Sequence, residues 1–370
     1  MKKILLFLLV SSTIWSQTPV QEESGTIDGA AFKIFIPDNW NKGLVMYAHG
    51  YAFMGSPLQS ENPEFVKNMN VFLSQGYAVA ASDYAYQGFA LSQGVDDTEA
   101  LRIYFIEKYG QPKQTIMAGH SMGGGITLAT LENFGKNYQG GLALCPLSSR
   151  PYLQCRKEFD MYATFNGLFP NVITSLTDIF DLEKPYTAQD SRKMVSRAQE
   201  ITKAIVTKDS LLGVAFANRF NLKFQDLPFS LFFNENVLRD LAQKAGGNPF
   251  DNTNTVYNGF PNDWEVNQKA ERVAATVDAN LLFEKYDRTG DINAPVVLMH
   301  TIYDQLIPLQ YGVTNFENMV INKDKTEFLS VRYTKGQGHC QFTPEETQQA
   351  LVSLLKWLET GEKPAPGAVE

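Results

Sequence analysis

Short apolar runs alternate with helical patterns along two parts of the chain. The runs predict buried strands, at 43–48, 77–82, 114–118, 141–144, 294–300 and 328–333. A more strictly alternating segment, 26–37, ends at a proline and predicts an edge strand or hairpin. Helical spacing occupies 64–75, 96–109, 122–134 and 344–360. Buried strands that alternate with helices indicate a parallel sheet covered by helices on both faces.

The alternation is interrupted in the middle of the chain. Over residues 147–290 no regular rhythm of strands and helices is visible. We therefore expect one sheet domain, formed by residues 17–146 and 291–370, with an insertion at 147–290.

The last helix, 344–360, has a well-marked start. Thr343 is the expected cap, Pro344 occupies the first turn, and Glu346 lies three residues after the cap, as in a capping box. The tail after Gly361 contains two prolines and is expected to be frayed.

The N-terminus is typical of a secretory signal. Lys2 and Lys3 precede an unbroken apolar run at 4–10, and small polar residues follow. Seven apolar residues are too few to cross a bilayer, so we expect no stable membrane insertion. Residues 1–16 are the expected signal peptide, with cleavage after Ser16, and the mature protein is expected to be secreted or periplasmic.

Composition narrows the classes of partner. The 370 residues carry a net charge of −8, with 32 basic and 40 acidic residues and no basic cluster, which argues against nucleic acid binding. The four histidines and three cysteines show no zinc-ligand spacing. We expect neither a metal nor a cofactor, and the oligomeric state stays open.

The segment Gly119-His120-Ser121-Met122-Gly123 has the form of a nucleophile elbow. It follows a buried strand and begins a helix, the context that this motif requires. The turn at such a serine is so sharp that small residues are needed two positions before and after it, and the two glycines supply them. Ser121 is therefore the candidate nucleophile.

A serine hydroxyl needs an adjacent base, and His339 is the candidate. It lies in a glycine-flanked loop between the last strand and the last helix, and this loop can fold back towards the elbow. His49 follows the first core strand and is expected to brace its loop. His120 is expected to point away from the serine, and His300 ends a strand, where a supporting role is expected.

The base needs an acid that fixes its tautomer. Asp304 follows the strand run 294–300, and the chain order Ser, Asp, His then fits. Asp291 precedes that strand and would lie at the wrong end of the sheet. Asp83 ends an earlier strand, where a capping or ion-pair role is expected.

Two backbone N–H groups are candidates for an oxyanion hole. Met122 begins the helix after the nucleophile, so its N–H points towards the developing charge. The loop His49-Gly50-Tyr51 follows the first core strand, and the N–H of Tyr51 is the second candidate donor.

These motifs occur in the order found in the α/β-hydrolase superfamily, which the sequence resembles. The matching segments are HGY at 49–51, GHSMGG at 119–124, the strand followed by Asp304, and GHC at 338–340. The resemblance implies an α/β fold with a mostly parallel eight-stranded sheet and helices on both faces. It also implies a mainly helical cap inserted after the sixth strand, which is where the insertion 147–290 lies. Many esterases, lipases and proline-type peptidases share the elbow sequence, so the resemblance specifies mechanism better than substrate.

The three cysteines allow one disulfide if the protein is exported. The His339-Cys340 pair is similar to tannase and feruloyl esterase sequences, where a cysteine beside the histidine is bridged to one beside the serine. Here His120 occupies that second position. Cys145 ends the strand next to the elbow strand, and we hypothesise a Cys145–Cys340 bond. A Cys145–Cys155 bond and three free thiols are the alternatives.

The insertion is rich in aromatic residues, most of which are expected to form its own core. They are Tyr152, Phe159, Tyr162, Phe165, Phe169, Phe216, Phe220, Phe224, Phe229, Phe232 and Phe233. A cap over the mouth of the sheet could also line an apolar acyl or aromatic site with some of them, which weakly favours ester substrates.

The leading hypothesis is an exported serine hydrolase that cleaves carboxylic esters. An aminopeptidase-like serine peptidase is the alternative, and acidic residues of the insertion would then hold the substrate N-terminus. The candidates for that role are Glu158, Asp160, Asp178 and Asp181. An acyltransferase would use the same three residues, and a non-catalytic binding protein of the same fold is the other class.

Overall fold

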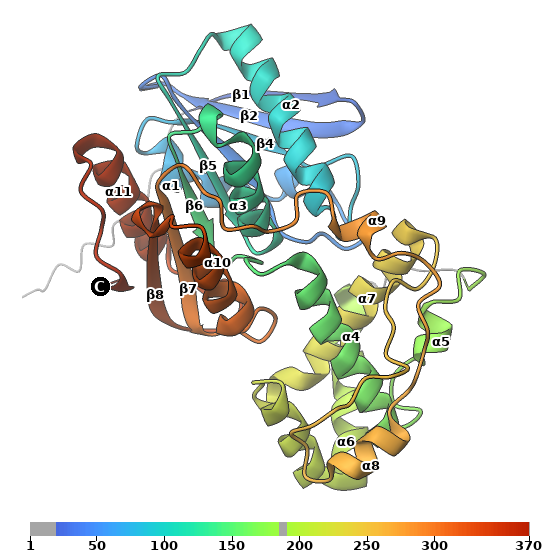
Figure 1. The fold of residues 1–370 in the computed structure, drawn as a ribbon. Coiled ribbons are helices and arrows are strands. Elements are labelled where there is room, and N and C mark those ends of the chain that lie inside the picture. The colour runs from blue at the N-terminus through green and yellow to red at the C-terminus, as the bar shows by residue number, and fades with distance from the viewer. Residues whose placement is uncertain (1–19, 185–190, 370) are drawn as a thin grey trace, which may run out of the picture.

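The computed structural model describes residues 20–184 and 191–369, so the expected signal peptide at 1–16 lies outside the described residues. One part of the molecule is built on a nine-stranded sheet, in the order β1-β2-β4-β3-β5-β6-β7-β8-β9 (Figure 1). The strands are β1 (Val20–Ile27), β2 (Ala30–Pro37), β3 (Gly43–Ala48), β4 (Ala78–Ser82), β5 (Gln114–His120), β6 (Gly140–Leu144), β7 (Val296–Tyr303), β8 (Leu329–Gln337) and β9 (Gly367–Ala368).

The sheet is mostly parallel, as the sequence predicts. Strands β1 and β2 form an antiparallel hairpin, and β2 pairs antiparallel with β4. All the other pairs, from β4 through β3, β5, β6, β7 and β8 to β9, are parallel. Every residue of β3 is buried, which explains why its sequence is continuously apolar rather than alternating.

Helices cover both faces of the sheet. On one face lie α1 (Pro63–Leu73) and α11 (Pro344–Thr360), whose apolar residues share one core cluster. On the other lie α2 (Leu91–Tyr109), α3 (Met122–Phe134) and α10 (Asn315–Asn322), in a second cluster. The placement of α2 and α3 opposite α1 and α11 is visible in Figure 1. The predicted layers are therefore confirmed.

The segment between β6 and β7 is helical in its described parts. Its helices are α4 (Pro151–Leu168), α5 (Leu176–Ile179), α6 (Ser191–Arg219), α7 (Leu227–Ala245), α8 (Asp263–Lys269) and α9 (Asn280–Phe283). Within 145–184 and 191–295 the segment contains no strand. Helices α4 to α8 form a lobe beside the sheet (Figure 1). Short 3-10 helices occupy Gln59–Glu61, Gly135–Asn137, Phe224–Asp226 and Thr326–Phe328, and a π-helical turn occupies Gln310–Thr314.

Most aromatic residues of this lobe pack against one another. The rings of Phe165 and Phe169 stack with their centroids 4.9 Å apart, and Phe216 meets Phe165 edge-on at 5.4 Å. Phe159 and Tyr162 are also completely buried. Burial of this kind supports the expectation that most of the eleven aromatic residues form a local core.

Two expectations about element ends are wrong. Helix α2 begins at Leu91, five residues before the predicted start at Asp96, because Leu91 and Val95 bury their side chains in the core beneath it. The tail after Gly361 is not frayed, since it adds β9 as a ninth strand beside β8. The Ser330 hydroxyl donates to the carbonyl of Pro364, which also holds this tail.

Across residues 20–184 and 191–369, no helix combines the length and apolar character that crossing a membrane requires.

The capping box of α11 gives a first testable prediction. The Thr343 hydroxyl accepts from the Glu346 N–H at 3.1 Å, and the Glu346 carboxylate accepts from the Thr343 N–H at 2.8 Å. Thr343→Ala should lower the free energy of unfolding by about 1 kcal/mol, measured by urea denaturation. Thr343→Ser keeps the acceptor and is the matched control; equal stability of the Ala and Ser variants would contradict the prediction.

Candidate active site

Ser121 lies at the sharp turn between β5 and α3. Its backbone angles, φ 59° and ψ −123°, are unusual for a residue with a side chain. The two flanking glycines are required by close packing. A Cβ on Gly119 would lie 2.4 Å from the carbonyl oxygen of Gly123, and one on Gly123 would lie 2.0 Å from that of Ala48. The geometry is that of a nucleophile elbow.

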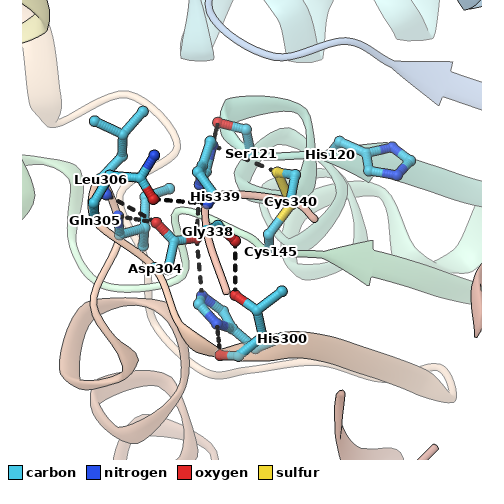
Figure 2. Close-up of a disulfide and its surroundings, with 12 residues drawn as sticks. His120, Ser121, Cys145, His300, Asp304, Gln305, Leu306, Gly338, His339 and Cys340 are labelled. Carbon is cyan, nitrogen blue, oxygen red and sulfur yellow. Dashed lines mark hydrogen bonds and ion pairs between the residues drawn. A yellow bond between two sulfur atoms is a disulfide. The ribbon is translucent and has the colours of Figure 1, made fainter. Parts of the chain in front are cut away.

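The structure brings Ser121, His339 and Asp304 together in one hydrogen-bonded chain (Figure 2). His339 Nδ1 lies 2.7 Å from Asp304 Oδ2, and His339 Nε2 lies 2.8 Å from Ser121 Oγ. An ionised carboxylate only accepts, so Nδ1 carries the proton and Nε2 is left to accept from the serine hydroxyl. This arrangement allows His339 to take the serine proton.

Asp304 is buried, and both of its carboxylate oxygens accept hydrogen bonds. Its Oδ1 accepts from the N–H groups of Leu306 at 2.9 Å and Ile307 at 2.8 Å, while Oδ2 faces His339. Burial alone would raise the pKa of Asp304, but the charge and hydrogen bond of His339, with smaller help from His300 and Ile307, hold it below the usual value. The carboxylate therefore stays ionised beside the imidazole.

The loop that carries His339 is fixed at several points. The His339 N–H donates to the side-chain oxygen of Gln305 at 2.8 Å. The N–H of Gly338 donates to the carbonyl of Tyr303 at 2.9 Å, and the carbonyl of Gly338 accepts from the Thr301 hydroxyl at 3.1 Å. These bonds orient the ring towards Ser121.

A disulfide joins Cys145 to Cys340, directly after His339, with 5.3 Å between the Cα atoms (Figure 2). Cys145 follows β6, the strand beside the elbow strand, as the hypothesis of this pairing requires. The competing Cys145–Cys155 bond is absent, because Cys155 is a free, buried thiol. The sulfur of Cys340 lies 3.4 Å from His339 Nε2, so the bridge packs against the imidazole itself.

The loop 49–51 lies against Ser121. A Cβ on Gly50 would lie 3.2 Å from the Cβ of Ser121. Met122 is the first residue of α3, and the N–H of such a residue has no acceptor within its own helix. Tyr51 and Met122 both line the cavity that reaches Ser121, which is compatible with the expected oxyanion donors.

The other three histidines lie outside the hydrogen-bonded chain. His49 stacks on Tyr84, with ring centroids 4.1 Å apart, and so braces its loop. His120 points away from Ser121 (Figure 2) and its Nδ1 is 2.7 Å from the Tyr47 hydroxyl. Burial, with a smaller effect of the His339 charge, lowers the pKa of His120 to about 4.

His300 has a position that sequence reasoning only partly anticipates. Its Nε2 lies 3.9 Å from Asp304 Oδ2, and its Nδ1 lies 2.9 Å from the carbonyl oxygen of Thr301. Burial lowers the pKa of His300, which favours the neutral ring. His300 therefore packs beside Asp304 without a hydrogen bond to it, and the only sequence signal for this is its place at the end of the strand before Asp304.

The chain was compared with known proteins in sequence and in fold. No family model matches the sequence. The o-phthalyl amidase of Xanthobacter agilis is 21% identical over 410 residues, which cover 93% of this chain and 88% of that protein. Feruloyl esterase B from Aspergillus oryzae aligns over 94% of this chain and 82% of its own, with a TM-score of 0.54 and 13% identity. The chain has the α/β-hydrolase fold.

A longer solved structure is also similar. Acylaminoacyl peptidase from Pyrococcus horikoshii aligns at 12% identity with a TM-score of 0.46. The match covers 93% of this chain, which spans 42% of the length of that peptidase.

A small cavity of about 30 Å³ reaches Ser121. Its lining combines residues of the sheet domain and of the helices between β6 and β7: Tyr51, Phe89, Ser121, Met122, Leu147, Gln154, Cys155, Glu158, Phe233, Val237, Leu306, Ile307 and His339. Of the eleven aromatic residues predicted in the insertion, Phe233 is the one found in this lining. Sequence reasoning missed Gln154 and Cys155, because α4 shows no clear period.

Across the part of the chain that the structure describes, no group of three or more His, Cys, Asp or Glu residues is arranged to hold a metal ion.

The disulfide gives a second prediction. The cysteines it joins are 195 residues apart, so the double variant Cys145→Ala/Cys340→Ala should lose on the order of 2–5 kcal/mol of stability to urea. In denatured, unreduced protein only Cys155 should react with a thiol reagent, and all three cysteines should react after reduction. Three reactive thiols before reduction would contradict the bond. Cys155→Ala, which leaves the bridge intact, is the control.

The buried His120 gives a third prediction. Its pKa is about 4 in the folded protein and about 6.5 in an unfolded chain, so between these values the unfolded state binds more protons. Its contribution to stability is therefore full above about pH 6.5 and is lost as the pH falls towards 4. His120→Gln should reduce the loss of unfolding free energy between pH 7 and pH 5.

His49 and His300, whose pKa values burial also lowers, remain in this variant. The pH dependence should therefore shrink without disappearing. An unchanged difference between the two pH values would contradict the assignment of a neutral, buried His120.

Proposed function

We propose that this protein is an exported serine hydrolase that cleaves carboxylic esters through an acyl-enzyme. The observation that carries the proposal is the chain Asp304–His339–Ser121, with bonds of 2.7 and 2.8 Å, opening into a largely apolar cavity. The apolar walls favour an acyl or alcohol group that is itself apolar or aromatic.

In the first half-reaction, Ser121 Oγ attacks the ester carbonyl carbon while His339 Nε2 takes the hydroxyl proton. The carbonyl electron pair moves to the oxygen, which the N–H groups of Met122 and Tyr51 stabilise in this proposal. When the carbonyl re-forms, the bond to the alcohol breaks, and His339 returns the proton to the leaving oxygen. Asp304 stabilises the imidazolium that exists in between.

In the second half-reaction, water repeats the same steps. His339 removes a proton from water as its oxygen attacks the acyl carbon, and the proton then passes to Ser121 Oγ as the ester bond to the enzyme breaks. The products are the free acid and the restored serine. Preorganised N–H donors and a fixed base supply most of the rate gain, since removal of one oxyanion donor costs on the order of 10²–10³-fold.

Export is supported by the sequence features of residues 1–16 and by the disulfide, because such bonds persist outside the reducing cytoplasm. In this proposal the catalytic domain comprises 17–146 and 291–370. Residues 147–290 form the cap that supplies one wall of the cavity.

A serine peptidase or amidase of the same fold is the second candidate. Glu158, one of the four acidic residues considered for such a role, is buried and lines the cavity that reaches Ser121. Asp178 instead pairs with Lys184 at the surface, and Asp160 bonds Arg156 at 2.9 Å. The curated relative is named as an amidase.

The fourth prediction separates these functions. A panel of p-nitrophenyl esters from acetate to palmitate, with methyl ferulate and an aminoacyl p-nitroanilide, should show ester cleavage by the wild type and none by Ser121→Ala. Asp304→Asn should lower kcat by about 10³-fold or more, because the wrong imidazole tautomer would face the serine.

Asp291→Asn is the matched control, since Asp291 lies before β7, where its carboxylate is 3.6 Å from the Lys325 ammonium. It should retain wild-type rates. Cleavage of the anilide alone would favour the peptidase, and full activity in Ser121→Ala would refute both proposals.

A further inference from the structure

Two polar side chains of α4 lie in the otherwise largely apolar wall of the active-site cavity. Gln154 and Glu158 are one helical turn apart and are only 2% and 5% exposed. Neither takes part in the steps proposed for Ser121 and His339. Polar groups at such depth need hydrogen-bond partners, because burial without one is costly.

The orientation of the Gln154 amide is determined by its neighbours. Its Nε2 donates to the carbonyl oxygen of Leu306 at 3.0 Å and to Glu158 Oε1 at 2.8 Å. A backbone carbonyl can only accept, so the nitrogen must face Leu306 and the amide cannot be flipped. Gln154 Oε1 is consequently left buried with no hydrogen-bond partner among the described residues.

Glu158 provides a second set of acceptor atoms beside that oxygen. Burial raises the pKa of Glu158, and the charge of Lys157 and the hydrogen bond from Gln154 oppose this only in part. The Lys157 ammonium gives one of its three donors to the carbonyl of Leu306, at 2.9 Å. Two residues of the cavity lining thus bring a buried, unpaired amide oxygen and a poorly solvated carboxyl close together.

We propose that Gln154 and Glu158 form a specificity subsite that binds a hydrogen-bond donor, an O–H or N–H group, on the substrate portion that fills this cavity. The inference rests on the proposed function and adds the substrate class to it. A donor from the substrate would satisfy Gln154 Oε1 and the Glu158 carboxyl together. A substrate that ends in a methyl group would leave both without that partner.

The test uses two series of esters, and within each series the esters differ only in one end group. One series of p-nitrophenyl esters has chains of matched length that end in a methyl, a hydroxyl or an ammonium group. A second series places the same end groups on the alcohol of butyrate esters. The wild type should prefer a donor-ended ester over its methyl counterpart by about tenfold or more in kcat/KM, mainly through KM. Rates measured with Ser121→Ala give the uncatalysed background.

Variants assign the preference to the two side chains. Glu158→Gln keeps the size of the side chain, and Gln154→Met removes the amide oxygen at similar volume. Both should bring the donor-to-methyl ratio towards one while methyl-ended esters are still cleaved. A larger loss for the ammonium than for the hydroxyl series in Glu158→Gln would identify an amine as the natural donor, and equal losses would identify a hydroxyl.

Asp160→Asn is the matched control, because Asp160 is also on α4 but does not line the cavity; it should keep the wild-type ratio. Equal cleavage of donor-ended and methyl-ended esters in both series would overturn the subsite while leaving the proposed esterase intact. Variants that lower all rates by one common factor would also overturn it, since that is the result of a structural role. Failure of the wild type to cleave any ester would overturn the proposed function and the subsite with it.

Discussion

The parallel pairing of β3, β5, β6, β7 and β8 is the constraint on which the candidate active site depends. In parallel strands the carboxyl ends meet at one edge, and each site residue follows one of these ends. Ala48 is opposite Gly119 in the register, so the loop of Tyr51 and the elbow of Ser121 begin at the same level. Tyr303 is opposite Gln337, which brings the residues that follow, Asp304 and His339, to the same level.

Close packing and a disulfide at this edge of the sheet further restrict the positions of Ser121 and His339. The contact between Gly123 and Ala48 leaves no space for a Cβ, so the start of α3 packs closely against the end of β3. The disulfide between Cys145 and Cys340 links the loop of His339 to the end of β6, the strand next to the elbow strand. His339 is therefore held in two ways, by the hydrogen bonds of its own loop and by the covalent bridge to Cys145 at the end of β6. Rigid support of this kind keeps a reacting group within catalytic distance.

Much of the sheet domain could be predicted from the sequence because its signals are local. Strand β3 and the helices α3 and α11 have the predicted bounds, since glycines or a capping box mark their ends. Ser121, Asp304 and His339 could be named in advance, because each follows a strand in the required order. The early start of α2 and the pairing of β9 were missed, since both depend on contacts with distant parts of the chain.

The cavity wall could not be predicted in the same way. Helix α4 is buried on several sides, so its apolar residues do not form a single stripe. Helix α7 likewise buries polar residues such as Asn236 and Asp240 among apolar ones. Gln154 and Glu158 look like ordinary surface residues in the sequence, and only the fold shows that they face the same cavity as Ser121.

The most direct test of the central claim, that His339 activates Ser121 as the nucleophile, is labelling with diisopropyl fluorophosphate followed by peptide mass spectrometry. Attack by Ser121 Oγ on phosphorus would expel fluoride and leave one phosphoryl adduct per chain. The account predicts that this adduct lies on Ser121 in the wild type, is absent in Ser121→Ala and forms far more slowly in His339→Ala. A folded wild type that stays unlabelled, or that carries the adduct on another residue, would contradict it.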